Sequence, residues 1–202
     1  MTRKVILAGL AGVLAVGISC SDSSTGPGQL REEDSLTFLS PAPDLPPFPV
    51  TTVSFFAVRD ENREVRLFYA KRPGDLDSTE FVRFEIPGGA LTSGPNGAPL
   101  VGDSILITLT ISDPSRLIVS FEPAGLRFAR PARLRIKYAE ADDDFNHDGS
   151  VDSEDSSDED EFFIWRQEQV GQPWVRLGSV RVKDQKEVEA EIDGFTNFAI
   201  AF

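Results

Sequence analysis

Short apolar runs that alternate with polar residues place the strongest limit on the fold of this chain. From Thr51 onward these runs follow one another, separated by Gly, Pro, Asp and Asn. A period of two predicts antiparallel β-strands with one buried face, and no window carries a sustained helical stripe. We therefore expect an all-β fold, an antiparallel β-sandwich of about ten strands over residues 51–202. The runs are Val53–Phe55, Val65–Tyr69, Val82–Ile86, Ile105–Ile111, Leu117–Phe121, Leu134–Tyr138, Val180–Val182, Val188–Ile192 and Phe198–Phe202.

An acidic run interrupts this pattern. Residues Glu140 to Glu161 contain twelve acids and no base, in a chain of formal net charge −13. Within the run, oxygen-bearing side chains stand at positions one, three, five, nine and twelve of a loop that starts at Asp144, with Gly149 at position six. This is the spacing of an EF-hand calcium loop. The predicted ligands are Asp144, Asn146, Asp148, Asp152 and Asp155, with the carbonyl of Ser150.

Calcium chemistry explains the spacing. Calcium is a hard cation that takes six to eight oxygen ligands, which one short segment supplies by wrapping around the ion. Gly149 permits the sharp turn, and Val151 is expected to pin the loop to the core or to a neighbouring strand. Asp155 stands where the standard loop has a bidentate Glu, and Ser156 where an apolar residue is usual, which predicts weaker binding. The alternative is a solvated acidic insertion that matches the motif by chance.

The loop sequence also resembles the calcium loops of dockerin modules. Dockerins carry two such loops flanked by helices, whereas this chain has one. The residues before it, 132–138, alternate like a strand, and Phe162–Trp165 after it also read as strand. We expect a calcium loop inserted at residues 140–161 between two β-strands, and no cohesin-binding module.

The N-terminus has the pattern of a bacterial lipoprotein signal peptide, residues 1–19. Arg3 and Lys4 precede fourteen apolar or small residues, too few to span a bilayer comfortably. The end of this run and the two residues after it, Gly17-Ile18-Ser19-Cys20, resemble a lipobox. The resemblance implies acylation of Cys20 and a lipid anchor in the cell envelope, in the outer membrane if the cell has two membranes. The alternative is an ordinary secretory signal with an incidental Cys. Residues 20–50, rich in Ser, Gly and Pro, predict a flexible tether.

The second half of the chain contains the segments Phe84–Leu91, Val119–Ile136, Trp174–Leu177 and Ile192–Phe198. In these segments it resembles the ZU-five domain, a β-sandwich module of ankyrins and netrin receptors. The resemblance covers roughly residues 80–202 and implies a protein-interaction module. Some relatives cleave themselves at a His-Phe-Ser site; the matching triplet here, Gly194-Phe195-Thr196, lacks the base.

Composition argues against most enzymatic chemistry. With one His and one Cys, the chain has no Ser-His-Asp or Cys-His arrangement and no zinc cluster, and its lone Cys forms no intramolecular disulfide. Paired carboxylates could support glycoside hydrolysis, but they crowd into one loop. No basic surface favours nucleic acid binding. The aromatic residues Trp165 and Trp174, with Phe162 and Phe163, predict either a sugar-binding platform or, in line with their usual burial, part of the core.

These observations predict a membrane-anchored, calcium-binding β-sandwich without enzymatic activity that acts as an interaction module for a protein of the envelope. A carbohydrate-binding surface module is the alternative, followed by a self-cleaving or hydrolytic domain.

Overall fold

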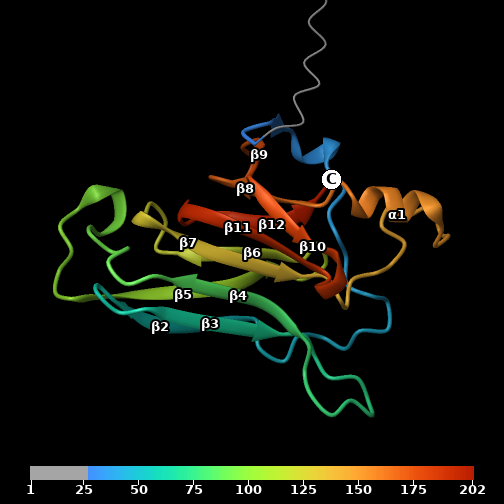
Figure 1. Ribbon diagram of the computed structural model, residues 1–202, viewed down its shortest axis with the longest axis horizontal. Coiled ribbons are helices and arrows are strands. Elements are labelled where there is room, and N and C mark those ends of the chain that lie inside the picture. Colours follow the sequence, from blue (N-terminus) through green and yellow to red (C-terminus); the bar gives the residue numbers. More distant parts are fainter. Residues whose placement is uncertain (1–26) are drawn as a thin grey trace, which may run out of the picture.

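Two antiparallel sheets stacked face to face form the body of the computed structural model, which describes residues 27–202 (Figure 1). The larger sheet has the order β1-β9-β8-β12-β6-β5-β2, and the smaller one β10-β11-β7-β4-β3. The strands are β1 Leu30–Arg31, β2 Thr52–Val58, β3 Arg63–Phe68, β4 Glu80–Ile86, β5 Ser104–Asp113, β6 Ile118–Glu122, β7 Arg127–Lys137, β8 Phe163–Gln167, β9 Trp174–Arg176, β10 Ser179–Val182, β11 Glu187–Gly194 and β12 Asn197–Ala201.

The predicted fold class, an all-β antiparallel sandwich, is confirmed. Every alternating run named above lies in a strand or directly beside one. The short strands β1 and β9 are additional to the predicted runs. The signal peptide and Cys20 lie outside the described residues, and no helix within residues 27–202 has the length and apolar character to cross a bilayer.

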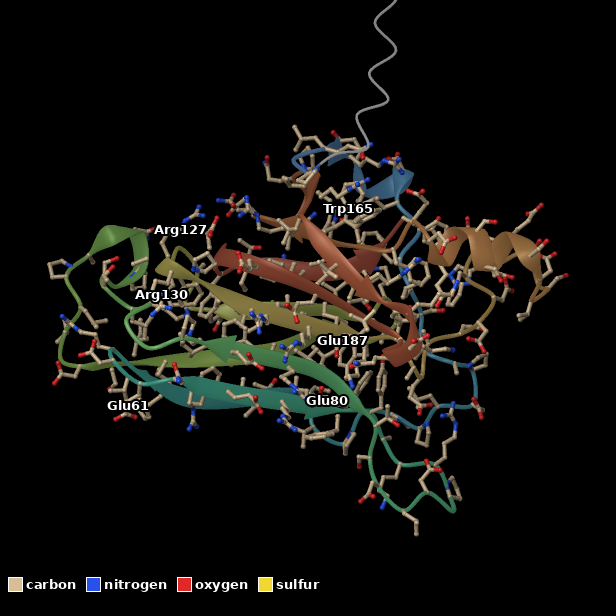
Figure 2. All side chains as sticks on the ribbon, in the orientation of Figure 1. Glu61, Glu80, Arg127, Arg130, Trp165 and Glu187 are labelled. Carbon is tan, nitrogen blue, oxygen red and sulfur yellow. The ribbon has the colours of Figure 1, made fainter. Side chains whose placement is uncertain are left out.

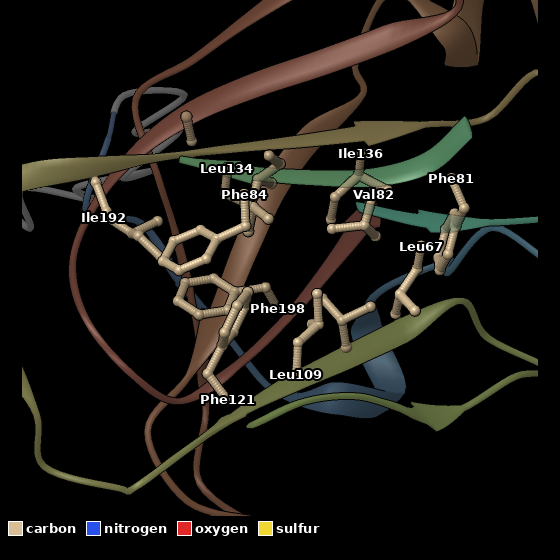
Figure 3. Close-up of a cluster of buried hydrophobic side chains, with 14 of the residues drawn as sticks. Leu67, Phe81, Val82, Phe84, Leu109, Phe121, Leu134, Ile136, Ile192 and Phe198 are labelled. Carbon is tan, nitrogen blue, oxygen red and sulfur yellow. The ribbon is translucent and has the colours of Figure 1, made fainter. Parts of the chain in front are cut away.

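The main core fills the space between the sheets with side chains from the inward face of each strand. Phe84 of β4 and Phe121 of β6 meet across this space, with ring centroids 4.6 Å apart (Figure 3). Phe84, Leu134 and Phe198 have no solvent exposure. Buried aromatic and branched side chains in close contact supply most of the stabilisation of a fold of this kind.

A second, smaller core lies on the outer face of the seven-stranded sheet. It joins Leu36 and Phe38 from the N-terminal segment to Trp165 and Trp174, which are only 2% and 1% exposed. Trp165 is labelled in Figure 2. The prediction of a flexible tether over residues 20–50 is therefore wrong for the part from residue 30 onward, which packs against the sheet. Residues 20–26 lie outside the described residues.

Strand β12, the last in the sequence, lies in the middle of the larger sheet. Residues Asn197–Ala201 pair with both β8 and β6, and the backbone of Leu39 and Thr37 bonds to Ile200 and Phe202. Because β12 is an interior strand, its loss would divide the sheet.

The acidic insertion contains a helix that the sequence pattern does not predict. α1, Ser153–Glu159, has no apolar stripe. It begins with a capping box in which Asp152 accepts the N–H of Glu154 while Asp155 accepts the N–H of Asp152. Local hydrogen bonds at its first turn, rather than an amphipathic pattern, explain why this segment is helical. The insertion therefore joins strand β7 to helix α1 before it reaches β8.

Candidate functional site

Phe145 anchors the acidic insertion to the sandwich. Its side chain is 6% exposed and its ring lies 4.8 Å from that of Phe162, nearly perpendicular to it. Val151, predicted to pin the loop, is 68% exposed, so that prediction is wrong. The apolar residue at position two of the loop, rather than the one at position eight, reaches the core.

The first half of the loop is folded by its own side-chain oxygens. Oδ1 of Asp144 and Oδ1 of Asn146 both accept the backbone N–H of Asp148, at 3.1 and 3.0 Å. The second oxygen of Asp144 accepts the N–H of Gly149 at 2.9 Å. Gly149 has φ +91°, a left-handed conformation that favours glycine. Oδ1 of Asp148 then accepts the N–H of Ser150, so three predicted ligands line the inside of one tight turn.

Asp155 closes the loop from its far end. One carboxylate oxygen accepts the N–H of Phe145 at 2.7 Å, and the other accepts that of Asp152 at 2.8 Å. The N–H of Asp152, followed by those of Phe145 and Asn146, lowers the pKa of Asp155 from its usual value. The side chain is 2% exposed. Asp155 therefore stays ionised and holds the beginning and the end of the loop together.

The basic residues of the neighbouring sandwich bind acids that flank the loop. Lys186 pairs with Asp143 at 3.0 Å, Lys183 with Glu159 at 2.8 Å, and Arg181 with Asp160 at 2.7 Å. In the part of the chain that the structure describes, no ion pair reaches the four predicted carboxylate ligands. Burial and the charge of Asp155 raise the pKa of Asp158, a sign of crowded like charges. The segment retains a local excess of negative charge after all its ion pairs are formed.

The five predicted ligands lie in one loop, where their side chains accept backbone amides. Asp144 and Asn146 both accept the N–H of Asp148, whereas Asp155 accepts the N–H groups of Phe145, Asn146 and Asp152, and Asp152 caps the helix. Within residues 27–202, no group of three His, Cys, Asp or Glu residues is close enough to hold a metal ion as it stands. Ser150 is exposed, so its carbonyl lies in an accessible part of the loop.

Sequence reasoning missed the contacts that join α1 to the sheet. The hydroxyl of Tyr138 donates to Oε1 of Glu159 at 2.9 Å, and Glu159 also pairs with Lys183. Burial, followed by the hydrogen bond to Glu159, raises the pKa of Tyr138. Glu159 is one of twelve acids in an acidic run, and no local signal distinguishes it from the others.

The remaining predicted sites are structural. Trp165 and Trp174 belong to the second core, so they offer no exposed sugar-binding row. A Cβ at Gly194 would lie 2.5 Å from the carbonyl oxygen of Leu126, which leaves no room for a base beside Thr196. His147 is exposed.

Neither a protein-family model nor a curated protein matches this chain.

Proposed function

We propose that this protein is a membrane-anchored β-sandwich whose loop from Asp144 to Asp155 binds one calcium ion, and that it serves the cell envelope as an interaction module rather than as an enzyme. One observation carries the calcium proposal. Four carboxylates share a loop that is closed by its own backbone amides, while the nearby basic residues pair with acids outside it.

The chemistry of the donor set fits calcium. The loop presents oxygen only, from the side chains of Asp144, Asn146, Asp148, Asp152 and Asp155 and the carbonyl of Ser150, and hard cations prefer such ligands. Each side-chain oxygen that accepts one amide keeps lone pairs for a further contact. A bound divalent cation would offset the repulsion among the carboxylates. Because Phe145 is buried in the core, a more stable loop would also stabilise the sandwich.

The expected affinity is weak. Asp155 has a shorter side chain than the usual Glu, and both its oxygens already hold backbone amides. Extracellular calcium modules of this kind bind with dissociation constants on the order of 0.1 to 1 mM. The occupancy of the loop would therefore follow the calcium concentration of the surrounding medium.

Calorimetric titration and thermal unfolding of the chain from residue 20, carrying Cys20→Ser, test the calcium proposal. We expect one site, and a melting temperature that rises with calcium. Asp144→Ala should abolish both effects. Asp143→Ala is the matched control. It removes the same charge one residue earlier in the chain, from a side chain that pairs with Lys186. Absence of calcium heat and of any shift in melting temperature in the parent protein would refute the proposal.

Because the N-terminal segment packs against the sheet, the distance between the proposed anchor at Cys20 and the sandwich is limited. Only residues 21–26 separate Cys20 from the described fold, and a fully extended chain gains about 3.5 Å per residue. The seven steps from Cys20 to Pro27 would therefore keep the start of the described fold within about 25 Å of the anchor. Fractionation of cells that express the protein with Cys20 or with Cys20→Ala tests the anchor, since only the Cys20 protein should sediment with membranes and carry the mass of acyl chains.

A further inference from the structure

The four edges of the two sheets differ in how they are protected. β1 is two residues long, β10 is four residues long and carries Arg181, and β3 carries Arg63, Glu64 and Arg66. Short length and charged side chains are the usual means of preventing edge pairing. β2 has neither: it is seven residues long, and no charged residue occurs between Asp44 and Arg59. Within the described residues, no other strand pairs with its outer side.

The backbone of β2 offers hydrogen-bonding groups along this edge, although the carbonyl of Val58 already accepts the N–H of Glu61 at 3.3 Å. The carbonyl of Thr51 accepts the N–H of Ile111, and the N–H of Arg59 donates to the carbonyl of Asp103. The N–H and C=O groups of the odd-numbered residues of β2 therefore point toward β5. In an antiparallel ladder, successive residues direct their N–H and C=O groups to opposite sides. The N–H and C=O groups of the even-numbered residues, Thr52, Ser54, Phe56 and Val58, therefore point to the open edge.

We propose that two copies of this protein pair through their β2 strands, antiparallel and related by a two-fold axis at Phe55. Only residues whose amides point outward can pair, which restricts the register to even residues facing even residues. A two-fold axis at Phe55 opposes Thr52 to Val58 and Ser54 to Phe56. This register uses every outward amide of both strands, whereas axes at Ser54 or Phe56 leave one end of the strand unpaired.

The side chains beside the edge support the same register. Phe56 is 60% exposed and lies opposite Leu106 of β5, which is 50% exposed. With the axis at Phe55, the Phe56 rings of the two copies become diagonal neighbours, a spacing within reach of aromatic contact. Two separate exposed apolar pairs would then form one patch across the interface. On the inner side, the guanidinium of Arg63 covers the Phe55 ring at 5.6 Å, so the contacts come from the outward row.

The acidity of the chain does not oppose a second copy at this edge. Of the net charge of −13, the segment from Glu140 to Glu161 accounts for most, with twelve acids and no base. That segment follows β7 and leads into β8, whereas β2 is an edge strand of the larger sheet, separated from β8 by β12, β6 and β5 (Figure 1). Glu61 lies in the turn beyond the strand rather than along it (Figure 2). Two copies can therefore meet along β2 with no like charges within the paired segment.

This pairing rests on the interaction part of the proposed function and would supply its partner, a second copy of the chain. It depends on neither calcium nor the anchor. Measuring mass with calcium and with chelator separates the two proposals: a dimer that binds no calcium would refute the calcium site alone, and a calcium-binding monomer would refute the pairing alone.

Analytical ultracentrifugation of the chain from residue 20, which contains both complete sheets and carries Cys20→Ser, tests the pairing. We expect a concentration-dependent species of twice the chain mass. Ser54→Lys places like charges across the axis and should weaken dimerisation roughly tenfold or more. Ser54→Pro removes an N–H that is unpaired in the monomer and should act in the same way while leaving the sandwich folded. Val180→Lys is the matched control on the β10 edge, where Val180 is 65% exposed, and should leave the dimer intact.

The register is tested by disulfide formation. A mixture of Thr52→Cys and Val58→Cys chains should cross-link more rapidly than either variant alone, because these residues face each other at a separation that suits a disulfide. A parent protein that remains monomeric up to about 1 mM would overturn the inference and leave the edge to a strand of another protein. A dimer unchanged by both Ser54 variants, or no preference for the mixed disulfide, would also overturn it.

Discussion

The sandwich and the acidic insertion are stabilised by different physical effects. The sandwich buries Phe84, Leu134 and Phe198 completely between its sheets, so its stability comes from apolar area removed from water. The insertion contributes one buried ring, Phe145, and otherwise depends on carboxylates, which accept backbone amides or bind polar and basic side chains of the sandwich. The first kind of stabilisation is indifferent to calcium. The second leaves a surplus of negative charge and is expected to respond to cations.

Removing β12 is the most severe way to test the independence of the sandwich. Deletion of Asn197–Phe202 removes the strand between β8 and β6 together with the fully buried Phe198, and the N–H of the Trp165 indole loses the carbonyl of Ala201. We expect a chain without cooperative unfolding at any calcium concentration, measured by circular dichroism. Replacing the edge strand Leu30–Arg31 by two glycines is the control and should leave a folded protein. A folded protein after β12 deletion would contradict the role of this strand.

A cavity in the main core should be costly and insensitive to calcium. Phe84→Ala removes a ring that contacts Phe121 at 4.6 Å, and buried Phe→Ala changes cost about 4 kcal/mol. Denaturant unfolding should give the same loss with calcium and with chelator. Leu76→Ala, at a side chain 91% exposed, should change the free energy of unfolding by less than about 0.5 kcal/mol. A loss for Phe84→Ala that varies with calcium would show that the two regions are not independent.

Sequence patterns predicted the sheets better than the segments that pack on them. The strands were readable because a period of two is a property of each strand by itself. Leu36 and Phe38 also alternate, but the polar composition of residues 20–50 concealed this short run. The helix α1 carries its signal in the pair Asp152 and Asp155, which the calcium motif had already assigned as ligands. Contacts such as Tyr138 with Glu159 depend on the tertiary fold, and the sequence contains no local sign of them.

Phe145 links the two regions, so its removal should lower both the stability of the fold and the affinity for calcium. Phe145→Ala removes the one buried ring of the loop, at an expected cost of about 3 kcal/mol, near the lower end for Phe→Ala because its ring partner is a single Phe162. It should also weaken calcium binding, since the loop loses its fixed position. Val151→Ala, at a residue 68% exposed, is the matched control and should have little effect on either measurement. The reverse ranking of the two variants would restore Val151 as the anchor.

The smallest expected effect distinguishes the regions by pH. Tyr138→Phe removes the hydrogen bond from the sheet to Glu159 of α1 and should cost about 1 kcal/mol at neutral pH. Burial and then Glu159 raise the pKa of Tyr138 in the folded state, so the unfolded chain, with a tyrosine pKa of about 10, loses this proton first. The stabilisation by Tyr138 is therefore fully present below about pH 10 and declines above it. Tyr69 is buried in both proteins and has a raised pKa, so its alkaline effect cancels in the comparison. Free energies of unfolding measured from neutral pH to about pH 11 should show the parent losing its advantage over the variant. A constant difference across that range would mean that Tyr138 is free to ionise in the folded protein, and that α1 is held to the sandwich by Lys183 and Arg181 instead.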